Sequence, residues 1–304
     1  MDSAEDLRRR IRGTTELGSV VRTMKALSAA NARQSEQAVL SLVDYAATIE
    51  LAMQAVSLYL PDDLQATALT SADERDGMAL GAIVFGTDQG MCGPFNDQIA
   101  SFAAEDVTAG GGSERAARVW AIGERLLPGL REAGLSIDRL FSVPSSIEGL
   151  SVKVSELLVD LENWRTGHGL DQIRLYYNRG TGPGAHRPNV VRFWPVDLSW
   201  LTGLRSRRWE SNTLPLVRVP WQEMLRRIAQ QYLYIGLYRG LAESLASENS
   251  SRLLTMERAE KNIDERLEEL TAEYNYVRQQ AITVELLDIV SGFEALADEQ
   301  KALI

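Results

Sequence analysis

The stretch YLYIGLYRGLAESLASENSSRLLTMERAEKNIDERLEELTAEYNYV, from Tyr232 to Val277, decides the fold of this 304-residue chain. No proline follows Pro220, and from Leu225 onward apolar residues recur at alternating spacings of three and four. Three polar residues interrupt this series: Arg239, Asn249 and Glu260. A heptad pattern held over about 60 residues, or roughly 90 Å of helix, is typical of a coiled coil. The sequence therefore predicts one long C-terminal helix that needs a helical partner.

The N-terminal segment is the candidate partner, because it is free of proline from about Ser3 to Leu60 and Pro61 ends it. Its predicted contact positions follow the same spacing: Leu7, Arg10, Thr14, Leu17, Val21, Met24, Ser28, Asn31, Ser35, Ala38, Leu42, Tyr45, Ile49, Ala52, Val56 and Tyr59. The middle of this series is small and polar, so the helix is marginal by itself. We expect it to pack against the C-terminal helix.

The charge distribution supports an antiparallel pairing. The formal net charge is -10. The charged residues within 7–33 are nevertheless mostly basic, and those within 257–273 are mostly acidic. If both helices enter an intervening domain, paired residue numbers sum to about 280, which places the basic block opposite the acidic block. Exposed ion pairs contribute only ~0.2 to 1 kcal/mol each, so they serve register more than stability.

By the same sum, the N-terminal helix ends opposite about residue 280 of the C-terminal helix. The stretch RQQAITVELLDIVSGFEAL, Arg278 to Leu296, is then left without a partner in its own chain, although it carries several large apolar residues. These are Val284, Leu286, Leu287, Ile289, Val290, Phe293 and Leu296. Such a surface is expected to contact another molecule.

The middle of the chain has a different pattern. Short runs rich in β-branched and aromatic residues, at 78–87, 117–123 and 172–180, alternate with helix-compatible segments at 96–105, 124–133 and 149–164. NVVRFWPVDL, at 189–198, adds a strand or an edge that Pro195 limits. This alternation predicts a Rossmann-like α/β domain with a parallel sheet. The expected organisation is an N-terminal coiled-coil helix at 1–60, an inserted α/β domain at 61–219 and a C-terminal coiled-coil helix at 220–304.

Three segments are interpreted as surface loops: TAGGGS at 108–113, TGPGAHRP at 181–188 and RSRRWESNTLP at 205–215. The two histidines, His168 and His186, are expected in such loops. Cys92 is the single cysteine, which excludes an intramolecular disulfide and a cysteine-based zinc cluster. No metal, cofactor or catalytic site is predicted. MDSAEDLRRRIRG has no apolar signal core, and no window holds the roughly 18 to 20 uninterrupted apolar residues of a membrane span.

GTDQGMCGPFN, from Gly86 to Asn96, lies between a predicted strand and a predicted helix, where a phosphate-binding loop would lie. Its spacing matches neither G-x-G-x-x-G nor a P-loop, so a structural turn is favoured over nucleotide binding. In that turn Asp88 would act as a cap, while Gly90 and Gly93 would permit close backbone approach.

The residues alone allow three other functions. One is an α/β nucleotide-binding enzyme dimerised by its terminal helices, and another is a helical adaptor or membrane-surface protein. Nucleic-acid binding by the basic N-terminal helix is disfavoured, because the chain is acidic overall and no aromatic residues lie among the arginines.

Three blocks resemble one known family, the γ subunit of the F-type ATP synthase. They are LRRRIRGTTELGSVVRTMKALSAANAR, GTDQGMCGPFN, and the C-terminal block with LASE, YN and RQ-AIT-EL-IV-G in place. The resemblance spans nearly the whole chain and is weakest at 61–76 and 181–213. It implies a non-catalytic rotor shaft that couples ion transport to ATP synthesis or hydrolysis.

The resemblance also implies partners. These are a ring of F1 alpha and beta subunits around the shaft, and the epsilon subunit and c-ring at its foot, with one copy of the chain per complex. The complex would lie peripherally on the cytoplasmic face of the bacterial plasma membrane. By matching position, Arg278, Gln279 and Thr283 would contact beta-subunit loops that grip the shaft. Met24 lies in the family's N-terminal contact region, and Glu285 is a further subunit contact. Gly90, Cys92 and Gly93 match the family's turn, where RGLCGGLN is usual.

Four positions depart from the family pattern. Lysine is usual where this chain has Ser19 and Asn31, arginine where it has Gln89, and glutamine where it has Val284. The departures put individual shaft contacts in question. They indicate that the chain belongs to a divergent branch of the family, for example the sodium-translocating type.

Overall fold

The computed structural model describes residues 3–59, 79–109, 117–195, 203–209, 211–213, 216 and 218–302, apart from the side chains of 292–302. The chain forms two compact units, residues 1–27 with 255–304 and residues 28–254. Helices α1 (Ala4–Ser57) and α7 (Trp221–Ala302) contribute to both units. Several predictions fall outside the described residues: those for Leu60 and Pro61, most of TAGGGS, the end of NVVRFWPVDL, and the side chains of Phe293 and Leu296.

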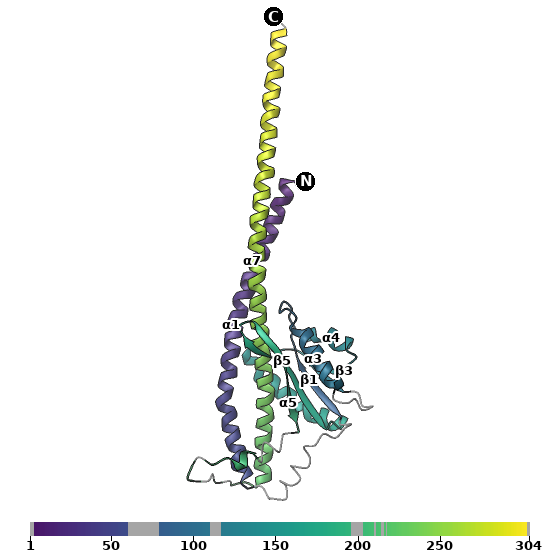
Figure 1. Ribbon diagram of the computed structural model, residues 1–304, viewed down its shortest axis with the longest axis vertical. Coiled ribbons are helices and arrows are strands. Elements are labelled where there is room, and N and C mark those ends of the chain that lie inside the picture. Colours follow the sequence, from purple (N-terminus) through teal and green to yellow (C-terminus); the bar gives the residue numbers. More distant parts are fainter. Residues whose placement is uncertain are drawn as a thin grey trace. The chain divides into compact units, whose positions relative to one another are not determined.

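In the first unit, the two terminal helices run antiparallel (Figure 1). A Cβ placed on Gly18 would lie 3.3 Å from Ile263 Cγ2, and Lys25 Nζ lies 2.9 Å from Glu260 Oε2. Both pairs agree with the predicted register. Leu7 and Leu270 are buried along the same seam. The expected pairing of the terminal helices is confirmed.

The predicted N-terminal seam is wrong at four of its sixteen positions, Arg10, Leu17, Tyr45 and Tyr59, which are exposed; the other twelve are buried or partly buried. Arg10 and Leu17, predicted as contacts, are exposed, whereas Ile11 is partly covered and Gly18 is buried. A 3,4 pattern allows two phases, and the apolar Leu17 favoured the wrong one. The small Gly18 lies at the seam instead, where it lets the helix backbones approach closely.

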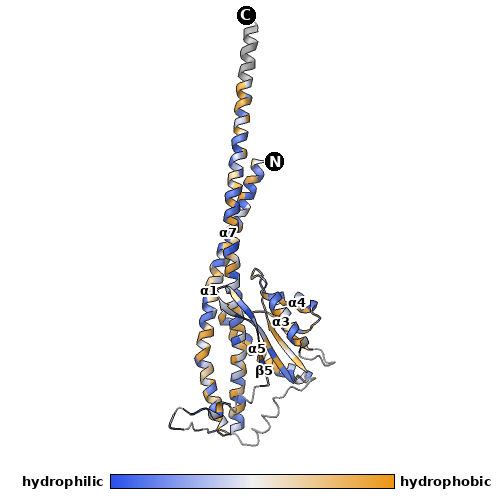
Figure 2. Ribbon diagram, viewed as in Figure 1, coloured by the Kyte–Doolittle hydropathy of each residue, from blue (hydrophilic) through white to orange (hydrophobic). Residues whose placement is uncertain are grey.

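In the second unit, α1 and α7 share an apolar cluster formed by Ile49, Met53, Val56, Leu204, Ile228 and Ile235. By length and composition α1 is the one described helix that could span a membrane, with a mean hydropathy of 1.4 over 18 residues. Of the residues in that window, 22% are buried inside the protein. Figure 2 shows apolar and polar residues interspersed along α1.

The same unit contains a five-stranded sheet of order β3-β2-β1-β4-β5. Strands β1 (Leu80–Phe85), β2 (Arg118–Ile122), β3 (Ser136–Phe141) and β4 (Gln172–Gly182) are parallel, and β5 (Ala185–Trp194) pairs antiparallel with β4. Helices α3 (Phe95–Ala109) and α4 (Leu127–Glu132) cover one face. Helices α5 (Leu150–His168) and α7 cover the other. Short 3-10 turns precede α4 and α5 at Glu124–Leu126 and Ile147–Gly149.

The structure corrects several sequence expectations. Strand β3 was not predicted, because Asp138 and Arg139 interrupt its apolar run; as an edge strand it tolerates them. The TGPGAHRP segment is the tip of the β4–β5 hairpin and part of β5, not a loop. Arg205 and Ser206 belong to a short helical turn. Strand β5 ends at Trp194, before the cis-linked Pro195, as the proline predicted.

The seam at Gly18 generates a test with an internal control. Gly18→Leu should destabilise the chain by ~1 to 3 kcal/mol, because the new side chain must displace Ile263. Gly13→Ala should stabilise it by about 0.5 to 1 kcal/mol, because α1 has no neighbouring atom within 4 Å of a Cβ there and alanine favours helix. Urea denaturation followed by circular dichroism measures both. Equal effects of the two substitutions would contradict this register.

Candidate functional site

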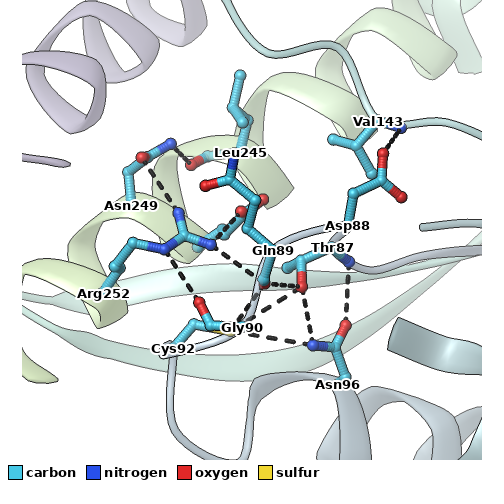
Figure 3. Close-up of polar contacts among 11 residues, drawn as sticks. Thr87, Asp88, Gln89, Gly90, Cys92, Asn96, Val143, Leu245, Asn249 and Arg252 are labelled. Carbon is cyan, nitrogen blue, oxygen red and sulfur yellow. Dashed lines mark hydrogen bonds and ion pairs between the residues drawn. The ribbon is translucent and has the colours of Figure 1, made fainter. Parts of the chain in front are cut away.

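The turn after β1 is held by its own side chains (Figure 3). Asn96, in the first turn of α3, accepts a hydrogen bond from the Thr87 amide at 3.0 Å and donates one to Thr87 Oγ1 at 2.9 Å. Thr87 Oγ1 in turn donates to the carbonyl of Gln89 at 2.7 Å. This network connects the end of β1 to the start of α3 and stabilises the conformation of the turn between them.

Asp88 fixes the turn to the rest of the sheet. Its two carboxylate oxygens accept hydrogen bonds from the amides of Glu124, at 2.9 Å, and Val143, at 2.8 Å. These amides follow β2 and β3, so one side chain connects the carboxyl ends of three strands. The sequence suggested that Asp88 caps its own turn; instead its carboxylate binds amides of the segments that follow β2 and β3.

The remaining residues of the turn are explained by their backbone conformation and their packing. Gly93 has a positive φ of 65°, a conformation that glycine adopts at little cost, and Met91 also has a positive φ, of 62°. The close backbone approach expected at Gly90 and Gly93 is not observed: a Cβ on Gly90 would lie 3.7 Å from the Arg125 side chain, and a Cβ on Gly93 would have no neighbouring atom within 4 Å. The Cys92 thiol is buried, and this burial raises its pKa, which keeps the sulfur protonated and unreactive.

The turn presents carbonyl groups to α7, and a guanidinium binds them. Arg252 donates from Nε to the carbonyl of Gly90 at 3.2 Å and from Nη2 to that of Gln89 at 3.3 Å. Nη2 also lies 2.6 Å from the Glu248 carboxylate. A phosphate needs convergent N–H donors, whereas carbonyl oxygens suit a cation. The geometry therefore argues against a nucleotide phosphate at this turn.

Arg252 and Glu248 form a buried ion pair, each with 5% of its surface exposed. Burial raises the pKa of the Glu248 carboxyl, and the nearby Arg252 charge opposes that rise. Sequence reasoning did not single out either residue. The available signal was an oppositely charged i,i+4 pair within a segment of small residues, ASENSSR.

His186 is not in a surface loop, contrary to the sequence expectation. It lies in β5, half-buried, with Nδ1 2.9 Å from Ser251 Oγ of α7 and its ring centroid 4.9 Å from that of Phe95. Its buried Nε2 has no hydrogen-bond partner, and burial lowers its pKa. His168 is exposed, but it ends α5 rather than lying in a loop.

The candidate contact residues lie in the first unit. Every described side chain of α7 from Arg278 to Ser291 is exposed, including Gln279, Thr283 and Glu285. Met24, on α1, is partly covered by the seam and is not brought next to them. Val284 is 57% exposed. Ser19 is exposed on α1, and in the second unit Gln89 lies in the turn and Asn31 is partly buried.

Beyond the turn, a cavity of about 400 Å³ opens beside Ala79, Arg118, Ser136 and His168. These residues lie at the amino ends of the parallel strands, whereas open α/β sheets bind ligands at the carboxyl ends. Within the described residues, no group of three or more His, Cys, Asp or Glu side chains could hold a metal ion.

The buried pair predicts a pH-dependent loss of stability. Arg252→Met leaves the Glu248 charge uncompensated and should cost about 3 to 5 kcal/mol at pH 8. The substitution raises the Glu248 pKa further, and stability linked to a raised carboxyl pKa is lost as pH rises, so the deficit should shrink at pH 5. Urea denaturation at both pH values tests this. The double substitution Arg252→Met, Glu248→Leu should restore most of the stability, and a pH-independent deficit would contradict the assignment.

His186 predicts the opposite dependence. Because its pKa is lowered in the folded state, the unfolded chain binds more protons below about pH 6.5, and stability falls as the pH drops through that range. His186→Gln should reduce this acid sensitivity between pH 7 and pH 5. The control His168→Gln, at an exposed position, should leave it unchanged. Equal behaviour of the two variants in thermal denaturation would refute this role of His186.

Comparison with known proteins assigns the family. The family model described as ATP synthase matches residues 3–296. The ATP synthase gamma chain of Moorella thermoacetica is 28% identical, covering 97% of this chain and 100% of the relative. That of Syntrophus aciditrophicus is 27% identical, covering 98% and 99%.

Among solved structures, a chain of the Euglena gracilis mitochondrial ATP synthase (OSCP/F1/c-ring) has a TM-score of 0.62 at 17% identity, covering 98% of this chain and 96% of that one. A chain of the Tetrahymena thermophila mitochondrial ATP synthase (central stalk/c-ring) has a TM-score of 0.55 at 16% identity, covering 79% and 99%. These matches support the gamma-chain reading and not the nucleotide-binding enzyme. The chain belongs to the ATP synthase gamma-chain family, that of the central rotor stalk of F-type ATP synthases.

Proposed function

We propose that this chain is the non-catalytic shaft of a rotary ATP synthase, coupling ion flow through a membrane sector to ATP synthesis or hydrolysis on other subunits. One observation carries the proposal. Beyond Val277, α7 continues past the N-terminus of α1 (Figure 1). Its described side chains from Arg278 to Ser291 are exposed. The segment is a bare helix that another component must surround.

The chemistry of this bare segment fits a bearing. Six large apolar side chains are between 46% and 60% exposed: Ile282, Val284, Leu286, Leu287, Ile289 and Val290. Polar and charged residues, among them Arg278, Glu285 and Asp288, interrupt them. A permanent interface would favour a continuous apolar core. A mixed surface binds weakly enough to slip past successive partners.

We assign the gripping contacts to Arg278, Gln279, Thr283 and Glu285, with Met24 as a further contact on α1. Thr283 Oγ1 donates to the Gln279 carbonyl one turn earlier, which orients both residues on one side of α7. Such groups offer polar contacts to beta-subunit loops at one rotary position. A shaft that presents different faces to the catalytic sites in turn would bias each site among its binding states.

The proposed partners follow from family membership and from the assemblies named for the solved relatives. F1 alpha and beta subunits would surround the terminal helices, and the epsilon subunit and c-ring would bind the inserted domain. The domain division at 1–60, 61–219 and 220–304 corresponds to shaft, foot and shaft. One copy per complex is expected, because a central axis has room for one shaft. The complex would be peripheral, on the cytoplasmic face of a bacterial plasma membrane.

Shortening the shaft tests this function. Truncation after Val277 removes the bare segment and should lower the ion transport driven per ATP hydrolysed in membrane vesicles that contain the assembled complex. The α/β domain should stay folded, because residues 28–254 form their own compact unit. A chain shortened only after Ser291 is the control, with a smaller expected loss.

Unchanged coupling after truncation at Val277 would refute the role of the bare segment. The non-catalytic assignment has a separate check, isothermal titration of the isolated chain with ATP. No tight binding is expected, and tight binding with turnover would favour an enzyme instead.

A further inference from the structure

The crevice where an open α/β sheet binds its ligand is filled here by the chain's own helix. In the order β3-β2-β1-β4-β5, the chain runs from β1 outward through β2 to β3, then crosses to β4 on the other side of β1. This reversal makes the carboxyl ends of β1 and β4 the topological switch point, the usual ligand site of such sheets. The turn after β1 borders it, and Arg252 of α7 is bound to that turn (Figure 3).

The contacts around Arg252 form one continuous connection. On one side its guanidinium binds the carbonyls of Gln89 and Gly90, and on the other it pairs with Glu248 and reaches Asn249 Oδ1 at 3.5 Å. The turn is itself tied to the sheet, because Asp88 accepts hydrogen bonds from Glu124 and Val143. A force applied to the sheet therefore has a path through hydrogen bonds into α7.

The other contacts between α7 and the sheet are less directional. Leu237, Leu241 and Ala242 of α7 pack into the apolar core, and such contacts allow sliding. Ser250 accepts a neutral hydrogen bond from the Gly184 amide at 2.8 Å, and Ser251 Oγ lies 2.9 Å from His186 Nδ1. Arg179 Nε of β4 lies 3.6 Å from Glu243 Oε2 of α7, with the Arg179 side chain 47% exposed. Hydrogen bonds that involve a charged group are about twice as strong as neutral ones, and a forked guanidinium also fixes direction. Among these described contacts, Arg252 combines burial with two charged hydrogen bonds to the turn.

We infer that Arg252 is a positioning residue for torque transfer, the joint through which the inserted domain turns α7. This inference rests on the proposed function, since it specifies which contact inside the shaft subunit passes rotation from foot to helix. In this chain the crevice at the switch point binds the protein's own Arg252 in place of a diffusible ligand.

The substitution Arg252→Lys tests the contact between α7 and the turn without removing the buried positive charge. Lysine keeps the positive charge beside Glu248 but lacks the fork that reaches two carbonyls. In hydrogen exchange of the purified chain, the amides of residues 89–93 should exchange about tenfold faster than in the unsubstituted chain. In vesicles with the assembled complex, ATP-driven membrane potential per ATP hydrolysed, read with an oxonol dye, should fall by about half, at equal complex content.

Ser250→Ala is the matched control on α7, because it removes the neutral hydrogen bond from the Gly184 amide and leaves the Arg252 contacts in place. The amides of residues 89–93 should exchange as in the unsubstituted chain, with coupling close to that of the unsubstituted chain. Coupling that survives Arg252→Lys, or falls equally in both variants, overturns the inference.

If Arg252→Lys assembles poorly, Glu248→Gln provides the second test. It removes the anion that holds the guanidinium and keeps the side-chain shape, so coupling should fall by a smaller amount; unchanged coupling overturns the inference. Failure of the proposed function is distinguishable, because the unsubstituted chain would then not assemble with catalytic subunits at all.

Discussion

The antiparallel register between α1 and α7 is the constraint on which the rest depends. Gly18 against Ile263 and Lys25 against Glu260 fix that register in the first unit. Helix α1 begins at Ala4, and every described side chain of α7 from Arg278 to Ser291 is exposed. A protein that builds a long helix and covers only part of it must present the remainder to other molecules. The exposed apolar residues from Ile282 to Val290 follow from that inequality in length.

In the second unit, a sheet domain packs directly against α7. Apolar packing of α5 and α7 on one sheet face supplies most of the attachment. The buried pair of Arg252 and Glu248 adds direction, at the cost of removing two charges from water. Retaining such a pair at the switch point is understandable if the contact must resist rotation as well as separation.

The coarse design could be predicted from the sequence because it depends on long periodic patterns. The heptads predicted both terminal helices and their pairing, and glycine-bounded apolar runs predicted β1, β2 and β4. Short or mixed patterns were insufficient. Strand β3 carries charges that an edge position tolerates, and the α1 seam has a small Gly18 where Leu17 looked the better contact.

The interior polar contacts were the least predictable part. A sequence does not reveal that His186 meets Ser251 or that Arg252 meets the carbonyls of Gln89 and Gly90, because these contacts join residues about 65 and 160 positions apart only after the sheet has formed. Local turn preferences suggested Asp88 as a cap of its own turn. Its actual partners, the amides of Glu124 and Val143 after β2 and β3, could not be predicted in this way.

Single-molecule rotation tests the central claim most directly. Val159, on α5, is 70% exposed, so Val159→Cys offers an attachment point for a bead, whereas Cys92 is buried and should not compete for the label. With the catalytic ring immobilised and ATP supplied, the account predicts continuous rotation of the bead in one direction. ATP turnover by the same complexes with a stationary bead would contradict it.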